Sequence, residues 1–209
     1  MTERIYFNND ELELATTVLG CSLHEDGHYH VVLAATLFHP QGGGQPSDTG
    51  LIGSASMLQA VQGDDGVIHV TDTPLELGPV ILKVDSETRA LHSRYHSAGH
   101  LIASVGEKYG WRALKGNHRP GEGRVVFELT GQAQPMTEDI LRADIVSLIA
   151  RDLPREIASS EGRRTVTWGE LSATACGGTH VQSTQEVGNI RIVRVKQKKE
   201  QLSVQYELD

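Results

Sequence analysis

A change of pattern near residue 85 divides this sequence into two parts with different folding preferences. Before it, short apolar segments such as Leu51–Ala60, Gly66–Thr71 and Val80–Val84 are separated by turns rich in glycine. After it, longer segments have the apolar spacing of helices. We therefore expect an α+β protein with two domains: residues 1–85 form a small β-barrel-like domain, and residues 86–209 form a second, α+β domain.

Two helices are expected in the second part. One runs from Glu87 to Tyr109 with a start at Ser86, and the other covers Thr137–Arg151, between two prolines. Further strands are expected at Val31–Phe38, Arg124–Leu129, Arg164–Trp168, Ile190–Val195 and Leu202–Leu208.

Composition narrows the compartment and the class of partner. No apolar run approaches the roughly 20 residues that span a bilayer, and the polar, acidic start MTERIYFNND is unlike a signal peptide. We therefore expect a cytoplasmic protein without a membrane partner. Cys21 and Cys176 are expected to stay thiols. Cys21, Trp111 and Trp168 are expected to pack in or beside the core.

Charge is distributed unevenly between the two parts. Residues 1–85 hold Arg4 and Lys83 against twelve acidic residues, whereas the rest of the chain holds 17 basic and 15 acidic residues. The second part is therefore the better candidate to meet an anion. Its basic residues are densest in Arg191–Lys199, which is equally well explained as an exposed edge strand that lysines protect from aggregation.

Two pairs of potential metal ligands lie in the second part. His96 and His100 are four residues apart on the expected helix, so that both project from one face. Cys176 and His180 have the same spacing in a segment without core periodicity. Thiolate and imidazole together suit one Zn²⁺ ion per chain. Four protein ligands would make the zinc structural and three would leave it catalytic, and the sequence is compatible with both.

Two glycine-rich segments accompany these residues. Gly177 and Gly178 allow backbone N–H groups to approach a ligand or a developing oxyanion, although a plain turn explains them too. The loop Gly42–Gln45 matches neither a Walker motif nor a dinucleotide fingerprint, so we expect no nucleotide cofactor. The Gln45 amide on this loop could hold a water or a carbonyl, while a hairpin turn accounts equally well for the glycines.

Three segments in this order resemble the editing domain of alanyl-tRNA synthetase. They are LFHPQGGGQPSDTG at 37–50, RYHSAGHL at 94–101 and ACGGTHV at 175–181. The resemblance covers nearly the whole chain, including the loop at 115–118, but 209 residues leave no room for an adenylation domain. The chain is therefore similar to the freestanding AlaX-type editing proteins, in the medium-length form with an N-terminal glycine-rich domain.

The resemblance implies a zinc-dependent aminoacyl-tRNA deacylase. Such an enzyme hydrolyses the ester that joins serine, and also glycine, to tRNA(Ala), and it spares alanine. The family's zinc positions match His96, His100, Cys176 and His180, and the glutamine that lines its editing pocket matches Gln45. Thr49 or Asp48 is expected to assist, and Gly178 is a candidate for oxyanion stabilisation.

The tRNA is expected to contact basic residues of the second part. These candidates for phosphate binding are Lys115, Arg119, Arg124, Arg194, Lys196, Lys198 and Lys199. Two alternatives remain: a non-catalytic tRNA- or protein-binding module with a structural zinc, and a zinc hydrolase that acts on a small ester or amide without RNA.

Overall fold

The computed structural model describes residues 1–131, 133–160 and 162–209. Its contacts divide the chain into two compact units. The first comprises Met1–Gly42 and Pro46–Ala90, and the second comprises Gly43–Gln45 and Leu91–Asp209. Over the described residues β-sheets dominate, and the helical content lies mainly in two α-helices, so the α+β class predicted from the sequence is confirmed in its general form.

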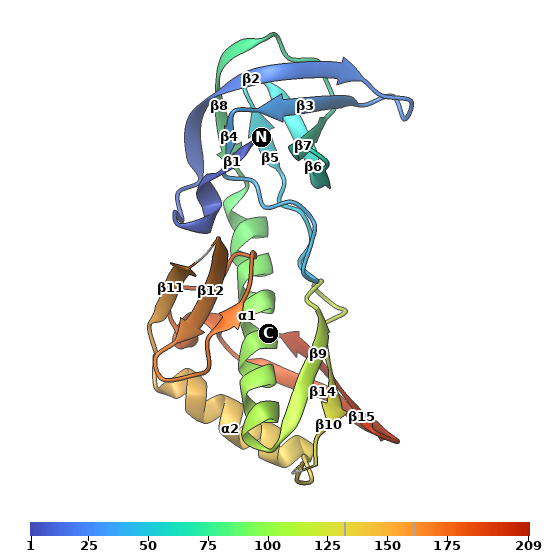
Figure 1. Cartoon of the computed structure of the whole chain (residues 1–209), viewed down its shortest axis with the longest axis vertical. Helices are drawn as coiled ribbons and strands as arrows, with labels where there is room; N and C mark the ends of the chain where they lie inside the picture. Colours follow the sequence, from blue (N-terminus) through green and yellow to red (C-terminus); the bar gives the residue numbers. More distant parts are fainter. Residues whose placement is uncertain (132, 161) are drawn as a thin grey trace. The chain divides into compact units, whose positions relative to one another are not determined.

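The first unit contains a closed barrel of six strands in the order β2-β3-β7-β6-β5-β8 (Figure 1). Its neighbouring strands pair antiparallel. The barrel strands are β2 (Glu13–Leu23), β3 (Tyr29–Leu33), β5 (Gly50–Ile52), β6 (Ala55–Gly63), β7 (Gly66–Thr71) and β8 (Gly78–Val84). A short parallel pair, β1 (Glu3–Arg4) with β4 (Ala35–Thr36), and the 3-10 helix η1 (Ile5–Phe7) complete this unit.

Alternation of side chains explains why these segments form a barrel. In β7, Val67, His69 and Thr71 are buried while the residues between them are more exposed, as expected for strands with one face toward a core. The inward side chains, among them Leu33, Phe38 and Leu82, form a hydrophobic core that belongs to this unit alone.

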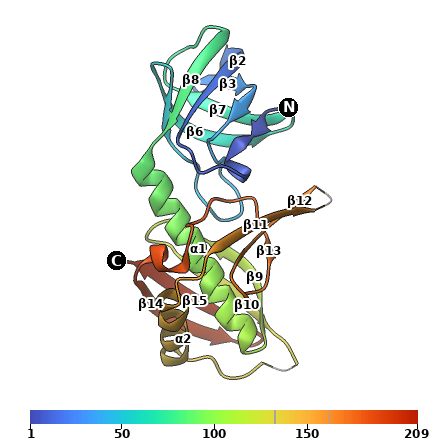
Figure 2. The same ribbon diagram turned by 90° about the vertical axis from the view of Figure 1, so that its left-hand side faces the viewer.

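The second unit combines α1 (Ser86–Lys108), which starts in the first unit, with two sheets and α2 (Glu138–Ala150). The larger sheet has the order β14-β15-β10-β9, and α1 and α2 pack on one of its faces (Figure 2). Its strands are β9 (Trp111–Asn117), β10 (Arg124–Leu129), β14 (Ile190–Lys198) and β15 (Gln201–Leu208). The smaller sheet consists of β11 (Arg155–Ser160), β12 (Arg163–Trp168) and β13 (Thr174–Ala175), and the 3-10 helix η2 (Thr184–Val187) precedes β14.

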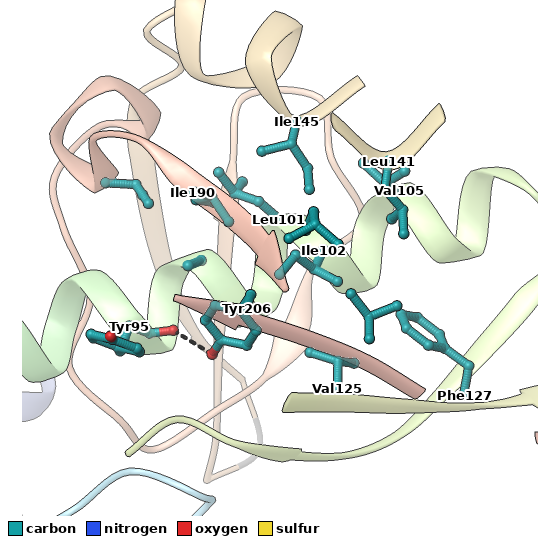
Figure 3. Close-up of a cluster of buried hydrophobic side chains, with 14 of the residues drawn as sticks. Tyr95, Leu101, Ile102, Val105, Val125, Phe127, Leu141, Ile145, Ile190 and Tyr206 are labelled. Carbon is teal, nitrogen blue, oxygen red and sulfur yellow. Dashed lines mark hydrogen bonds between the residues drawn. The ribbon is translucent and has the colours of Figure 1, made fainter. Parts of the chain in front are cut away.

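One hydrophobic core joins the helices of the second unit to the large sheet (Figure 3). Leu101 and Ile102 of α1 are fully buried in the same cluster as Ile145 of α2 and Phe127 of β10. The strand faces that point away from this core carry polar and basic residues instead. The large sheet therefore has one apolar and one polar face.

The ends of the helices agree with their sequence signals, with one correction. The hydroxyl of Thr137 accepts a hydrogen bond from the N–H of Ile140 and caps α2. At the start of α1, however, the carboxylate of Asp85 accepts a bond from the N–H of Thr88 at 2.7 Å, so Asp85 and not Ser86 is the capping residue. Among the described residues, no helix has both the length and the apolar character needed to cross a membrane.

Candidate metal centre

Four donor side chains gather in the second unit. His96 and His100 lie one turn apart on α1, and Cys176 and His180 lie in the loop that follows β13. One ligand atom from each of the four lies within 4.8 Å of all the others. The fold therefore brings together the two pairs that the sequence spacing singled out.

Two distances from the Cys176 sulfur match those between the ligand atoms of a tetrahedral zinc ion. The Cys176 sulfur lies 3.4 Å from Nε2 of His96 and 3.5 Å from Nε2 of His180. A Zn²⁺ ion with tetrahedral bonds of about 2.3 Å to sulfur and about 2.0 Å to nitrogen sets its ligand atoms about 3.5 Å apart. Because both the spacing and the donor chemistry agree, the residues present fit a zinc ion.

Burial keeps the imidazole of His100 neutral. The pKa of His100 is lowered to about 4, first by burial and then by the nearby charge of Arg164. The ring of Trp168 lies 5.7 Å from that of His100 and 5.6 Å from that of His180. Burial raises the pKa of the Cys176 thiol, so a metal ion that binds there must displace a proton.

The hydrogen bond to Gln45 determines which ring nitrogen of His96 carries the proton. Its Oε1 accepts hydrogen bonds from Nδ1 of His96 at 2.7 Å and from the N–H of Thr179 at 3.0 Å. A carbonyl oxygen can only accept, so Nδ1 of His96 carries the proton and Nε2 keeps its lone pair on the side of Cys176. Gln45 thus stands in the place where many metal sites have an oxygen acceptor behind a histidine ligand.

Hydroxyl groups connect α1 to the loop that carries Cys176 and His180. Nε2 of Gln45 donates to the Thr179 hydroxyl at 2.8 Å, and this hydroxyl lies 2.7 Å from that of Ser93 on α1. One turn further along α1, the Ser97 hydroxyl accepts a bond from the N–H of Val181. The two halves of the donor set are therefore held in register by buried hydrogen bonds.

The turn at Gly178 brings the loop close to the helix. A Cβ on Gly178 would lie 2.2 Å from a carbon of the His96 ring and 2.7 Å from Oε1 of Gln45, so this approach requires glycine. The N–H of Gly178 donates to the Cys176 sulfur at 3.5 Å. Arg164, which is buried, donates to the carbonyls of Cys176 and Gly178 and fixes the shape of the turn.

Thr49 and Asp48 belong to the first unit. The carbonyl of Thr49 accepts the N–H of Asp85 at 2.9 Å, and its side chain is partly exposed. Asp48 is fully buried, and its carboxylate accepts from the guanidinium of Arg89 and from the N–H of His39. This carboxylate is therefore engaged in holding the first unit together.

A basic groove of about 400 Å³ lies on the polar face of the large sheet. Cross-strand pairing explains it: Lys115, Val126, Ser203 and Lys196 form one row across four strands. None of the nine lining residues is acidic. They are Lys115, Arg124, Val126, Arg194, Lys196, Lys198, Gln201, Ser203 and Gln205.

Five of the seven predicted phosphate contacts therefore share one surface. The other two, Arg119 and Lys199, are exposed but do not line the groove. Lys199 lies in the turn after β14 with a φ of 54°. The sequence did not indicate the glutamines and the serine of β15, because they lie beside the cations only through strand pairing.

A second group of donors, in the first unit, is a weaker candidate for metal binding. His24, Asp26 and His30 lie near the turn between β2 and β3 and bring ligand atoms within 4.8 Å of one another. The His24 and His30 rings, however, are stacked nearly parallel, 4.0 Å apart. Two imidazoles that bind the same ion direct their lone pairs at it from different sides. The rings of His100 and His180, whose planes are 71° apart, can do so.

Several residues of the site were not singled out from the sequence, although Ser97 and Thr179 lie within the motifs at 94–101 and 175–181. Thr179, Ser93, Ser97 and Arg164 act through hydrogen bonds between segments that are far apart in the chain. Cys21 is partly buried against the first core, and Trp111 and Trp168 are buried in the second, so the packing role predicted for the tryptophans is confirmed. Both cysteines are free thiols, as predicted.

Comparison with known proteins agrees with the resemblance in the motifs. The family described as "Threonyl and Alanyl tRNA synthetase second additional domain" matches residues 164–203. The chain is 28% identical to alanyl-tRNA editing protein AlaX-L of Pyrococcus horikoshii over 97% of its own length and 56% of that protein. It is 30% identical to the mouse alanyl-tRNA editing protein Aarsd1, over 91% of this chain and 54% of that one.

Alanine–tRNA ligases are also similar. The enzyme of Haloquadratum walsbyi is 28% identical over 92% of this chain, which corresponds to 24% of the ligase. The chain thus spans about half the length of the two editing proteins and a quarter of the ligase. Its similarity to alanyl-tRNA editing proteins, inferred from three short motifs, is confirmed over most of the chain.

Proposed function

We propose that this chain is a zinc-dependent deacylase that hydrolyses the ester bond of tRNA(Ala) mischarged with serine, and also with glycine, and that it spares correctly charged alanine. The observation that carries the proposal is the His/His/Cys/His cluster, whose ligand atoms lie within 4.8 Å of one another and which is hydrogen-bonded to Gln45, in a chain similar to alanyl-tRNA editing proteins over most of its length. One zinc ion per chain is held by His96, His100, Cys176 and His180.

Residues of this chain have separate roles in the proposed reaction. A bound zinc ion supplies positive charge for polarising an oxygen or orienting the substrate. Gln45 keeps the lone pair of His96 on the side of the ion, and Gly178 lets the loop approach this pair. His96 and His180 are buried, and Trp168 packs against the rings of His100 and His180 on one side of the cluster. Thr49 is kept as an assisting residue on the resemblance alone.

Selectivity for serine over alanine calls for a polar site. The two side chains differ by one hydroxyl, which an apolar pocket rejects poorly, so a site that recognises the hydroxyl is the expected solution. The buried hydroxyls of Ser93 and Thr179, beside Gln45, supply polar groups of this kind in the second unit. They support a role of the second unit in recognising the amino acid.

The basic groove is proposed to bind the tRNA backbone. Its five cations come from strands β9, β10 and β14, and neutral hydrogen-bonding side chains of β15 lie between them. Phosphates that approach the groove meet several positive charges without an acidic neighbour among its lining residues. Arg119 and Lys199 are retained as peripheral contacts. On this proposal, residues 86–209 are the editing domain, residues 1–85 the glycine-rich domain and the cytoplasm the compartment.

Single-turnover deacylation tests this function. Purified protein is mixed with seryl-, glycyl- and alanyl-tRNA(Ala), and bound metal is measured in parallel. We expect rapid loss of serine, loss of glycine and retention of alanine. Cys176→Ala should abolish the reaction, and Gln45→Ala should slow it by about 10–100-fold, the usual cost of removing a partner behind a metal ligand. Intact seryl-tRNA in the presence of folded, metal-loaded protein would refute the enzymatic function.

A second candidate function is favoured by the completeness of the donor set. Four protein ligands close a zinc tetrahedron, as in structural sites, and the chain would then be a tRNA-binding module without catalysis. Tight tRNA binding without deacylation would support this module. Equally fast cleavage of free seryl esters would instead support a hydrolase that does not require RNA.

A further inference from the structure

His118, which follows β9, sits in a space that three glycines leave open. It is buried, and a Cβ on Gly99 or Gly116 would lie 2.2 Å or 2.3 Å from its ring atoms. A Cβ on Gly44 would lie 3.0 Å from the same ring and 2.4 Å from the carbonyl oxygen of Gly116. These glycines come from three separate segments, so the surroundings of His118 are shaped for one imidazole ring.

Two tyrosines fix the orientation of this ring. The hydroxyl of Tyr206 donates to the carbonyl of Tyr95 at 2.9 Å, a bond drawn in Figure 3. Since the hydroxyl proton is used there, Nδ1 of His118 must donate to the Tyr206 oxygen, 2.8 Å away. Burial raises the pKa of Tyr206, so this hydroxyl stays protonated. The ring of His118 is thus anchored to the core side of α1 and β15.

The anchored residue touches both His96 and the segment that carries Gln45. Its ring stacks on that of His96 with centroids 4.6 Å apart and planes 21° from parallel. Its backbone N–H donates to the carbonyl of Gly44 at 2.8 Å, one residue before Gln45. Gln45 in turn accepts the Nδ1 proton of His96. His118 therefore contacts one partner of this hydrogen bond, His96, through its ring and holds the backbone next to the other partner, Gln45, through its N–H.

We propose that His118 is a positioning residue: by stacking on His96 and tethering the backbone beside Gln45, it sets the position of these two residues relative to each other. Asparagine in its place reproduces the Nδ1–H donor without the stacked ring, and leucine reproduces neither. The consequence for catalysis rests on the proposed deacylase function. The consequence for metal binding does not, because it concerns only the donors on this chain.

Metal affinity tests this role independently of activity. Co²⁺ is titrated into the metal-free full chain, and its dissociation constant is read from the visible absorption of the bound ion. We expect His118→Leu to weaken Co²⁺ binding about tenfold, a typical effect beyond the ligands themselves, and His118→Asn to recover part of the loss. The double variant with Gln45→Ala should bind no more weakly than Gln45→Ala alone, because His118 acts on the hydrogen bond between Gln45 and His96, which Gln45→Ala already removes.

Trp111→Phe is the matched control, since it removes a partly buried hydrogen bond to the Gln134 carbonyl at the far end of β9. It should lower stability and leave Co²⁺ affinity unchanged. If His118→Leu does not fold, Tyr206→Phe, which deletes the acceptor of Nδ1–H, should weaken binding in its place. The role would be overturned if His118→Leu left the Co²⁺ affinity unchanged or if Trp111→Phe lowered it equally. It would also be overturned if the losses of the two single variants multiplied in the double variant, or if the parent chain did not bind Co²⁺. If the variants change Co²⁺ affinity as expected but the parent chain does not deacylate tRNA, only the proposed function is refuted.

Discussion

Neighbouring oxygen atoms that accept a hydrogen bond determine which ring nitrogen carries the proton in three buried histidines. The carbonyl of Val31 lies 3.2 Å from Nδ1 of His69, so that nitrogen carries the proton and Nε2 accepts from the Thr36 hydroxyl at 2.8 Å. His96 is fixed by Gln45 and His118 by Tyr206 in the same way. A neutral ring with both nitrogens bonded resists protonation, and this links histidine chemistry to stability.

His69 should make the first unit sensitive to mild acid. Burial lowers its pKa from 6.5 to about 4. A lowered folded-state pKa contributes stability that is complete above 6.5 and is lost as the pH falls through the range from 6.5 to about 4. Urea unfolding followed by circular dichroism should therefore show a loss of about 2 kcal/mol between pH 7.5 and pH 5 from this group.

The variants His69→Gln and His28→Gln isolate that contribution. His69→Gln lowers stability at pH 7.5 but should remove about 2 kcal/mol of the pH dependence, because glutamine does not titrate. His28, whose side chain is about half exposed, serves as the control, and its replacement should leave the pH dependence intact. An identical slope in His69→Gln and the parent chain would contradict the assignment.

The residues of the candidate site divide into those that local spacing reveals and those it does not. The donors at 96, 100, 176 and 180 could be paired from the sequence, because four-residue spacing and thiol–imidazole chemistry are local properties. Thr179 and Arg164 reach the site through bonds to residues far away in the chain or across a turn, among them Gln45 and Gly178. The role of His118 is visible only in the folded chain, where Gly44, Gly99 and Gly116 lie against its ring. No local pattern predicts such convergence.

At the scale of elements, local sequence signals predicted the helices and the short apolar strands. The strands that they did not predict form through pairing with segments far away in the sequence. The predicted strands at Gly66–Thr71 and Arg124–Leu129 coincide with β7 and β10. Strands β2 and β9 were not predicted. In β9, whose sequence is WRALKGN, only Trp111 is buried, while Arg112, Leu114 and Lys115 are exposed. Pairing with β10 therefore decides the conformation of this segment.

The basic groove on these strands makes a prediction about salt. Replacing Arg194, Lys196 and Lys198 with glutamine removes three cations from one strand and should weaken tRNA(Ala) binding. It should also reduce the slope of log affinity against log salt by about 2–3, since each lost phosphate contact contributes about 0.7–0.9. Affinity is measured by filter binding over a range of potassium chloride concentrations.

A control with equal charge separates this effect from net charge. Lys108, Arg142 and Arg151 lie on or beside α1 and α2, do not line the groove and are exposed. Their triple glutamine variant has the same net charge but should keep nearly the parent slope. Equal losses in both triple variants would show that binding follows net charge, and an unchanged slope in the groove variant would leave β14 as a protected edge only.

On the scale of the whole molecule, the two units share one helix but not one core. The unit boundary falls inside α1, at Ala90 and Leu91, and each unit has its own hydrophobic cluster. Both tryptophans, Trp111 and Trp168, lie in the second unit, as do all four metal donors. Tryptophan fluorescence therefore reports on the unit that would bind the metal.

Removing the metal should lower the stability of the second unit selectively. A ligand present at about a thousand times its dissociation constant stabilises the folded state by about 4 kcal/mol, so a chelator should lower the fluorescence-detected melting temperature by roughly 10–20 °C. Hydrogen exchange of β3 and β7 should stay unchanged, because the barrel has its own core. Cys176→Ser, with one donor weakened, should melt lower before chelation and respond less to it. A drop in barrel protection equal to that of the second unit would show instead that the two units unfold together, with α1 as the element that couples them.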